Sequence, residues 1–583
     1  MSCLIGVTVG PIQAYIKESR KLSDLYVSSK IMSDIMKNII KFIKEKDAEA
    51  RLIYPNYDVL DIDATGDCSN YMVFEAENVI DMKNIEESVY NKLAQGNEKL
   101  VKQFKDDFYL FWGIKDFAVD NYHSTYLKLE RLMRSLKNTY MFTQSCQEGG
   151  KKCSICGKRN IVRLTDDIKR KKGVAEDENL CPTCLFKREY LDKKLNQKFS
   201  SSIYSISINV WKKNNEKFLQ EINSELLDVF KQVNKVSFEE VDRYYDVNQL
   251  SNLIKKFKGK DEKIESKLIL IKKELEKVYN EKNDIKIPDY EYCLMQLDVD
   301  DLGKWIRGEF LKNKDTDELK NFQKKLSAFL IEFGLELRSF FEKSECQVVY
   351  SGGDDSLIIL PTEEIMYALD NIDKIFEELV WNKMKKYFDI TRKISYSISA
   401  TIAKCNNPLG YSIQRSREEL ERVKTRFNRE ADNKNGVSFN YIINDGKEIV
   451  CYLRRNTVKL FYSLVKEYEN IEEDGSFSYI NWYETEFSKF NYTDISFENL
   501  LSLKTIMKCE MKRLLGRSIK GRNSEENRVH YINGMIELLN KLYLENYTEN
   551  RSNHITIDFL NILNTFKLYE KLCSLNFHFE KGV

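Results

Sequence analysis

The sequence lacks any apolar run approaching the roughly 20 residues that a membrane-spanning helix needs. Its first residues, Met1–Val9, have no basic region followed by a long apolar core, so they do not resemble a signal peptide. Charge of one sign is not in excess either, because 92 Lys and Arg balance 91 Asp and Glu in 583 residues. The whole chain therefore gives no sign of a general polyanion binder, and nucleic-acid contacts would come from local patches. We expect a cytoplasmic protein with no membrane partner.

The pattern of the 13 cysteines does not indicate a disulfide framework. Most of them stand singly in apolar surroundings, which is typical of buried free thiols in a reducing compartment. Four of them form two knuckles, Cys153-X-X-Cys156 and Cys181-X-X-Cys184. Four thiolates at this spacing can close a tetrahedral Zn²⁺ site, and two matched pairs favour metal over a redox dithiol. Since all four ligands are cysteines, the predicted zinc is structural.

Hydrophobic periodicity predicts an α+β multidomain fold. We expect a mixed α/β unit over 1–145, a zinc-binding module over 146–190, a helical domain over 191–287, a second α/β unit over 288–446 and a C-terminal helical domain over 447–583. Strands near 292–297, 347–350, 357–360 and 394–402 alternate with helices near 317–342, 363–387 and 410–430. This β-α-β-β-α-β order is the ferredoxin-like pattern, and the first unit is interpreted as its diverged copy.

The second α/β unit carries a cluster of acids at two predicted strand ends. Gly352-Gly353-Asp354-Asp355 forms the tip of a hairpin, where glycines tolerate positive φ and let a ligand approach the backbone. Asp298 ends the strand that lies beside this hairpin in a ferredoxin-like sheet. The three carboxylates should therefore converge and bind two Mg²⁺ or Mn²⁺ ions, which activate an attacking 3′-oxygen and hold pyrophosphate. The alternative is a plain polar turn.

Other residues around these acids suit a nucleotide. Backbone amides at the start of the helix after Asp298 suit a triphosphate, and a lysine on a later helix can reach phosphate. The residues expected to bind nucleotide are Gly303, Lys304, Gly352, Gly353, Ser356 and Lys424. For Asp300 and Asp301, capping of the helix is at least as good an interpretation as metal binding.

Two charged stretches remain open to more than one interpretation. The acids of the first unit either position a cationic ligand or belong to a solvated loop: Asp58, Asp61, Asp63 and Asp67. A basic stretch near the C-terminus either faces RNA phosphates or a protein subunit, or is a solvated helix face: Lys508, Lys512, Arg513, Arg517, Lys520 and Arg522.

Four features, in order along the chain, resemble the large palm-domain subunit of type III-B CRISPR RNA-guided effector complexes. The first is Gly10-Pro11-Ile12-Gln13-Ala14-Tyr15-Ile16, running on to Ser19–Leu25. The second is the pair of cysteine knuckles. The third is Asp298-Val299-Asp300 followed by Gly303-Lys304-Trp305, and the fourth is Gly352–Asp355 followed by Pro408-Leu409 and the helix of Lys424.

The resemblance implies a nucleotidyltransferase that makes a second messenger when target RNA is bound. Family members polymerise ATP into cyclic oligoadenylates, and some join ATP to S-adenosylmethionine instead. The implied partners are other subunits of the complex, guide RNA and target RNA. Catalytic roles carry over to Asp298, Asp354 and Asp355 only. A catalytically idle RNA- and subunit-binding scaffold is the alternative of another class, and a free-standing cyclase is a third.

The sequence departs from the fuller pattern of this family. Many members begin with an HD nuclease domain, whereas this chain has four histidines, no His-Asp dipeptide and a palm-like segment at its start. We therefore expect no DNA cleavage by this chain. The first palm also lacks an acid at the end of its opening strand and a Gly-Gly-Asp-Asp hairpin, so it should frame substrate without holding catalytic metal.

Overall fold

The structure is a computed structural model, and its description covers most of the chain. The described residues are 3–57, 67–77, 80–116, 121–139, 149–165, 169, 174, 178–194, 202–232, 241–281, 285–344, 346–428, 434–443, 446–469, 477–488, 494–495, 497–519, 525–549 and 555–574.

The first α/β unit is a four-stranded antiparallel sheet with the order β2-β3-β1-β4. Its strands are β1 (Cys3–Gly10), β2 (Arg51–Tyr54), β3 (Tyr71–Ala76) and β4 (Tyr109–Asp116). Strand β1 is central and apolar, and its side chains are buried on both faces. The helices of this unit are α1 (Ile12–Lys17), α2 (Leu22–Lys46), α3 (Met82–Leu93), α4 (Glu98–Asp107) and α5 (Tyr122–Asn138).

The second α/β unit repeats this topology with two strands added. Its sheet has the order β10-β9-β8-β5-β7-β6. The strands are β5 (Glu291–Val299), β6 (Gln347–Ser351), β7 (Asp355–Pro361), β8 (Tyr396–Lys404), β9 (Gly436–Ile442) and β10 (Glu448–Arg454). The helices are α14 (Leu302–Ile306), α15 (Thr316–Glu342), α16 (Ile365–Phe376), α17 (Lys383–Tyr387) and α18 (Leu409–Arg426), with a π-helical turn over Glu377–Asn382 and a 3₁₀ turn over Thr362–Glu364.

Both units therefore have the ferredoxin-like order, β4-β1-β3-β2 in one and β8-β5-β7-β6 in the other. This confirms the predicted fold class. One boundary needs correction, because β10 pairs with β9 and extends the second sheet beyond residue 446. The segment before the C-terminal helices reads EIVCYLR and buries only Cys451 and Leu453, too weak an alternation to separate it from the helical sequence that follows.

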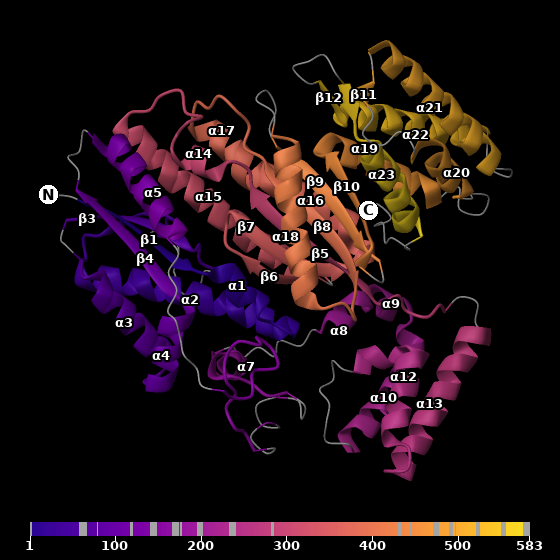
Figure 1. Cartoon of the computed structure of the whole chain (residues 1–583), viewed down its shortest axis with the longest axis horizontal. Coiled ribbons are helices and arrows are strands. Elements are labelled where there is room, and N and C mark those ends of the chain that lie inside the picture. The colour runs from indigo at the N-terminus through magenta and orange to yellow at the C-terminus, as the bar shows by residue number, and fades with distance from the viewer. Residues whose placement is uncertain are drawn as a thin grey trace.

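The remaining described elements are mostly helical (Figure 1). The middle segment holds α7 (Pro182–Lys194), α8 (Ile203–Ser207), α9 (Asn209–Asn214), α10 (Glu216–Gln232), a 3₁₀ turn (Asp242–Tyr245), α12 (Val247–Phe257) and α13 (Glu262–Glu281). The C-terminal segment holds α19 (Arg455–Glu469), α20 (Ser478–Phe487), α21 (Phe497–Ser518), α22 (Glu525–Glu545), α23 (Phe559–Cys573) and a small sheet of β11 (Asp494–Ile495), β13 (Ile555–Ile557) and β12 (Tyr547–Glu549). None of the helices in the described part of the chain has the length and apolarity needed to cross a bilayer.

Helix α15 joins the two sheets, since it packs on β6 of the second and contacts β2 and α5 of the first (Figure 1). One hydrophobic core runs through this junction and includes Leu4 and Tyr126 together with Met295 and Leu326. Polar bonds cross it as well: Lys320 Nζ lies 3.0 Å from a carboxylate oxygen of Glu75, and Arg307 lies 2.6 Å from Glu130. The two units thus pack as one body.

Candidate functional site

The end of β5 and the tip of the β6–β7 hairpin meet, as the sequence predicted. Asp298 lies opposite Asp355 in the antiparallel register of β5 and β7. The backbone N–H of Val299 donates to the carbonyl oxygen of Asp354 at 2.9 Å. These bonds place the three predicted acids beside one another because adjacent strands hold their backbones about 5 Å apart.

The hairpin tip is a tight turn in which one glycine adopts the special conformation. The N–H of Gly352 donates to the carbonyl of Asp355 at 2.9 Å, and Gly353 has φ +101°. Positive φ at the first central position suits glycine. Of the two glycines expected to tolerate positive φ, only Gly353 uses it, and Gly352 is not in the left-handed region.

Burial and mutual repulsion raise the pKa of all three acids above the usual value of an aspartate. Burial, with repulsion from Asp298 as the next cause, raises the pKa of Asp354 to about 6. Burial and the charges of Asp354 and Asp298 raise the pKa of Asp355 well above its usual value. Burial also raises the pKa of Asp298, although Lys424 acts in the opposite direction through its ion pair with this carboxylate. A bound cation would relieve this repulsion.

The donor chemistry of the three acids suits Mg²⁺ or Mn²⁺, which prefer carboxylate oxygens. Their arrangement is looser than that of the cysteines: within the described residues, only the four-cysteine group has ligand atoms that all lie within 4.8 Å of one another. Lys424 occupies an oxygen of Asp298. Binding of two metal ions would therefore require this lysine to release Asp298 and the carboxylates to rotate.

A cavity of about 210 Å³ lies between the two sheets and opens beside these acids. From the predicted set, Asp298, Gly352 and Asp355 line it, together with Tyr350, Gln296, Leu297, Arg417, Leu420 and Glu421 of the second unit. The first unit contributes Ile12, Gln13, Ile16, Ser29, Met32, Ser33, Asp67, Cys68, Ser69 and Asn70. The cavity is thus walled by both palm-like units.

Several predicted nucleotide-binding residues lie outside this wall. None of the described lining residues comes from α14, which carries Gly303 and Lys304, and Gly303 instead lies beside the ion pair between Arg307 and Glu130 of the first unit. Ser356 is buried, and its hydroxyl lies 2.8 Å from that of Ser351, so it supports the hairpin. Gly353 packs against the backbone of Leu330 on α15.

Arg417 is a cavity residue that the sequence interpretation missed. It lies on α18, seven residues before Lys424, and therefore on the same face of this helix. Its charge acts to lower the pKa of Asp355 and of Tyr350, which places its guanidinium near both groups. The spacing of seven residues between Arg417 and Lys424, which places two cations on one helix face, is a sequence signal that could have pointed to Arg417. The polar residues of the first unit, such as Asn70, follow no pattern that points to a site.

The two further acids after β5 are structural anchors and do not cap α14. Asp300 is buried and accepts bonds from the hydroxyls of Ser395 and Ser397, both at 2.8 Å, and from the N–H of Asn435 at 2.9 Å. Asp301 stands at the N-cap position, immediately before α14, with φ 53°, yet its side chain accepts no capping bond. The capping interpretation of these residues is therefore wrong.

Asp301 is instead surrounded by cations. Its carboxylate lies 2.9 Å from Lys434, 3.6 Å from Lys304 and 3.7 Å from Arg392. Burial acts to raise the pKa of Asp301, but these cations outweigh it and the pKa falls below its usual value. An acid already neutralised by three cations is a poor candidate for a metal ligand.

Asp67 is the one member of the first acidic stretch that lies in the described residues, and it is not in a solvated loop. Its carboxylate pairs with Arg338 of α15 and accepts the backbone N–H of Ser351 at 2.9 Å. The side chain is 6% exposed. Asp67 therefore braces the hairpin from the other unit. The companions Asp58, Asp61 and Asp63 lie outside the described residues.

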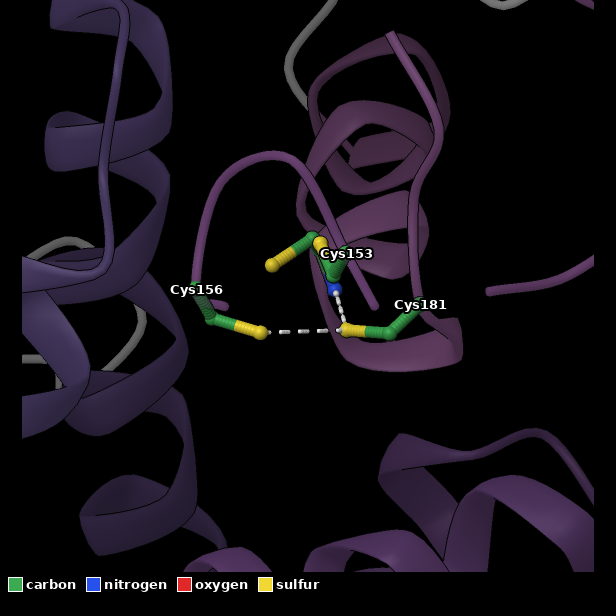
Figure 2. Close-up of side chains that lie close together, drawn as sticks. Cys153, Cys156 and Cys181 are labelled. Atoms are coloured by element: carbon green, nitrogen blue, oxygen red, sulfur yellow. Dashed lines mark hydrogen bonds between the residues drawn. The ribbon is translucent and has the colours of Figure 1, made fainter. Parts of the chain in front are cut away.

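The four predicted cysteines gather in one cluster (Figure 2). The sulfurs of Cys156 and Cys181 are 3.8 Å apart, and thiolates around a tetrahedral zinc ion are separated by about 3.8 Å. The N–H of Cys184 donates to the sulfur of Cys181 at 3.4 Å. Gly157, with φ +68°, turns the chain after the first knuckle, and Pro182 opens α7 within the second. Four soft donors so arranged could hold a metal ion.

The basic stretch near the C-terminus lies partly on α21. Lys508, Lys512, Arg513 and Arg517 belong to this helix, and Arg513 pairs with Glu510. Lys520 and Arg522 lie outside the described residues.

Known families match both α/β units. The family described as "Cas10/Cmr2, second palm domain" matches residues 291–435. The family described as "CRISPR-associated protein Cmr2, N-terminal" matches residues 4–101. The first match covers the strands that carry the three acids, and the second covers the part of the first unit that lines the cavity.

Individual relatives agree with these matches. A curated protein of Pyrococcus furiosus, "CRISPR system Cmr subunit Cmr2", is 24% identical over 435 residues, which are 69% of this chain and 46% of the relative. The chain thus matches about half the length of this relative. Among solved structures, the apo state of a type III-B Cmr-beta complex contains a chain with TM-score 0.62 and 13% identity, covering 98% of this chain and 82% of the other.

A second Cmr-beta structure, bound to cognate target RNA, gives TM-score 0.60 and 12% identity, covering 98% of this chain and 83% of the other. At this identity the likeness concerns the fold, which extends over nearly the whole chain. Family matches on both sheets, a curated relative and a shared fold agree with the motifs of the sequence, and both α/β units of this chain are similar to domains of the Cas10/Cmr2 family.

Proposed function

We propose that this chain is a nucleotidyltransferase that uses ATP to make a second messenger within a type III-B CRISPR effector complex. The observation that carries this proposal is the meeting of Asp298, Asp354 and Asp355, two of which, Asp298 and Asp355, line a cavity shared by the two palm-like units. Mg²⁺ or Mn²⁺ bound there would activate a ribose 3′-oxygen and neutralise charge on the departing pyrophosphate.

The chain's own residues have separate roles in this proposal. Asp298, Asp354 and Asp355 supply the oxygen ligands. Lys424 and Arg417, on one face of α18, supply positive charge for phosphates, and Lys424 would exchange Asp298 for phosphate when ligand enters. The first unit closes the other side of the cavity without an acid of its own on β1.

The proposed partners are other effector subunits, guide RNA and target RNA. A Cmr-beta structure with the same fold is bound to cognate target RNA, which supports this assignment. For the product we propose a cyclic oligoadenylate. The alternative acceptor is S-adenosylmethionine in place of a second ATP, and product analysis with and without S-adenosylmethionine separates the two.

For the cysteine cluster we propose a structural zinc ion held by Cys153, Cys156, Cys181 and Cys184. The 3.8 Å sulfur separation and the absence of a non-cysteine ligand in the group support a closed site. Zinc has no step in the proposed reaction.

The test is to incubate the assembled complex with target RNA, Mn²⁺ and labelled ATP, with and without S-adenosylmethionine, and to identify products by mass spectrometry. We expect pyrophosphate release and a product with the mass of a cyclic oligoadenylate. A conjugate that forms only when S-adenosylmethionine is present would show that S-adenosylmethionine, and not a second ATP, is the acceptor. Replacing both Asp354 and Asp355 by Ala should abolish turnover while leaving target-RNA binding intact. Wild-type complex that binds RNA yet releases no pyrophosphate would leave a scaffold role alone.

A further inference from the structure

Helix α1 forms one wall of the proposed nucleotide cavity. Ile12, Gln13 and Ile16 of this six-residue helix line it. The end of α1 also touches α18, because Lys17 donates to Gln414 and the backbone of Lys17 lies close to Gly410. A helix this short has little stability of its own, so its position depends on what packs on it from outside.

The cysteine module contacts the other side of α1 through Lys187. The ammonium group of this lysine donates to the carbonyl of Tyr15 at 2.8 Å and to that of Glu18 at 2.9 Å. It also lies 3.9 Å from the centre of the Tyr15 ring. Lys187 is only 2% exposed. A buried lysine is costly unless it is fully bonded, and here the carbonyls at the negative end of α1 supply the bonds.

Lys187 is tied to the cysteine cluster by the helix that carries both. It follows Cys184 by three residues on α7, so it lies less than one turn away. Further ion pairs join the module to the chain between α1 and α2. Arg188 donates to Asp24 at 3.1 Å. Arg159 lies 2.8 Å and Lys158 lies 2.7 Å from the carboxylate of Glu18. The module therefore holds both ends of the segment that links α1 to α2.

We propose that Lys187 is a positioning residue that fixes α1 as a wall of the cavity, so that the cysteine module sets the affinity of the site for a nucleoside triphosphate. This inference rests on the proposed function for its ligand. It does not give Lys187 any contact with substrate, since α1 lies between them. The expected signature is weaker substrate binding with little change in the chemical step.

The test compares Lys187→Met with wild type in the full chain and in the assembled complex. Hydrogen exchange of the amides over 12–19 should accelerate about tenfold, without added nucleotide. The ATP concentration for half-maximal turnover should rise at least fivefold, while kcat stays within twofold. If Lys187→Met does not fold, Lys187→Gln, which keeps an N–H donor on a shorter side chain, should show the same changes at smaller size.

The matched control is Lys571→Met. Lys571 is another shielded lysine, paired with the buried Glu291 at 2.7 Å, at the opposite end of β5 from Asp298. Its loss should lower thermal stability without changing exchange over 12–19. Unchanged exchange in α1 of the Lys187 variants would overturn the proposal, as would an equal change in the Lys571 variant. A wild-type complex that does not bind ATP would overturn the proposed function instead, because the exchange measurement needs no ligand.

Discussion

At the scale of single residues, Asp298 and Asp300 stand two positions apart at the end of β5 and have different roles. The side chain of Asp298 is 34% exposed and lines the cavity. Asp300 is 2% exposed, and its carboxylate accepts hydrogen bonds from Ser397 of β8 and from Asn435, just before β9. Residue type alone could not separate them, because both follow an apolar strand. What separates them is which neighbouring groups donate to each carboxylate.

The variants Asp298→Asn and Asp300→Asn should therefore fail in opposite ways. Asp300→Asn replaces an oxygen that accepts charge-assisted bonds and should lower the free energy of unfolding by about 1–3 kcal/mol, while Mn²⁺ binding is retained. Asp298→Asn should weaken Mn²⁺ binding at least tenfold with a smaller stability change. Thermal unfolding and Mn²⁺ titration of the same samples measure both. Loss of Mn²⁺ binding in a folded Asp300→Asn protein would contradict this division.

At the scale of elements, helix α15 shows how a helix positions the hairpin that carries Asp354 and Asp355. A Cβ built on Gly334 would lie 3.0 Å from the hydroxyl of Ser351 and 3.2 Å from its carbonyl oxygen. The hairpin therefore sits directly on the helix at this glycine. No pattern in the sequence points to this contact, since a glycine inside a helix usually only weakens the helix.

Gly334→Ala should displace the hairpin tip and reduce turnover at least tenfold, although alanine favours the helix itself by roughly 0.5–1 kcal/mol. The measurement is nucleotide turnover alongside thermal stability. The matched control is Gly516→Ala on α21, where the nearest atom to an added Cβ is Arg528 Nη2 at 3.9 Å. This variant should keep full turnover. Equal turnover in both variants would show that the hairpin does not depend on close approach to α15.

The four cysteines of the cluster were predicted together from their spacing, and the zinc proposed for them invites a stoichiometric test. Elemental analysis of the purified chain should give one zinc per chain. Cys184→Ser should lose it and unfold at lower temperature, because a structural metal contributes folding free energy. Cys451→Ser alters a buried thiol outside the cluster and should keep the zinc. Retention of zinc by Cys184→Ser would show that the metal binds elsewhere.

The elements also show what sequence patterns can and cannot predict here. Strands flanking Asp298 and Gly352–Asp355 are strongly apolar, so the second unit, its order and the convergence of its acids were predictable. Strand β10 was missed because its alternation is weak. Gly303 and Lys304 were placed in the nucleotide site on local helix geometry, whereas tertiary packing turns Gly303 toward Glu130.

At the scale of the whole molecule, the site exists only because two similar units pack against each other. Neither unit encloses the cavity alone, and the brace from Asp67 to Ser351 crosses between them. Such cross-unit bonds have no sequence signal, since their partners are hundreds of residues apart. The geometry of the cavity should therefore be as stable as the junction around α15.

Gln323 of α15 is the residue with which to test this dependence. It is fully buried, accepts from the hydroxyl of Tyr122 in the first unit and donates to the carbonyl of Ile306 at 2.8 Å in the second. Gln323→Leu removes both of these buried bonds, at about 1–3 kcal/mol each. Calorimetry should show the two sheets still unfolding in one transition at a lower temperature. Gln249→Leu, which removes only an exposed bond with Arg243, should leave that temperature unchanged. Two separate transitions in the Gln323 variant, one per sheet, would mean that the units fold independently and that the cavity is a contact between separate bodies.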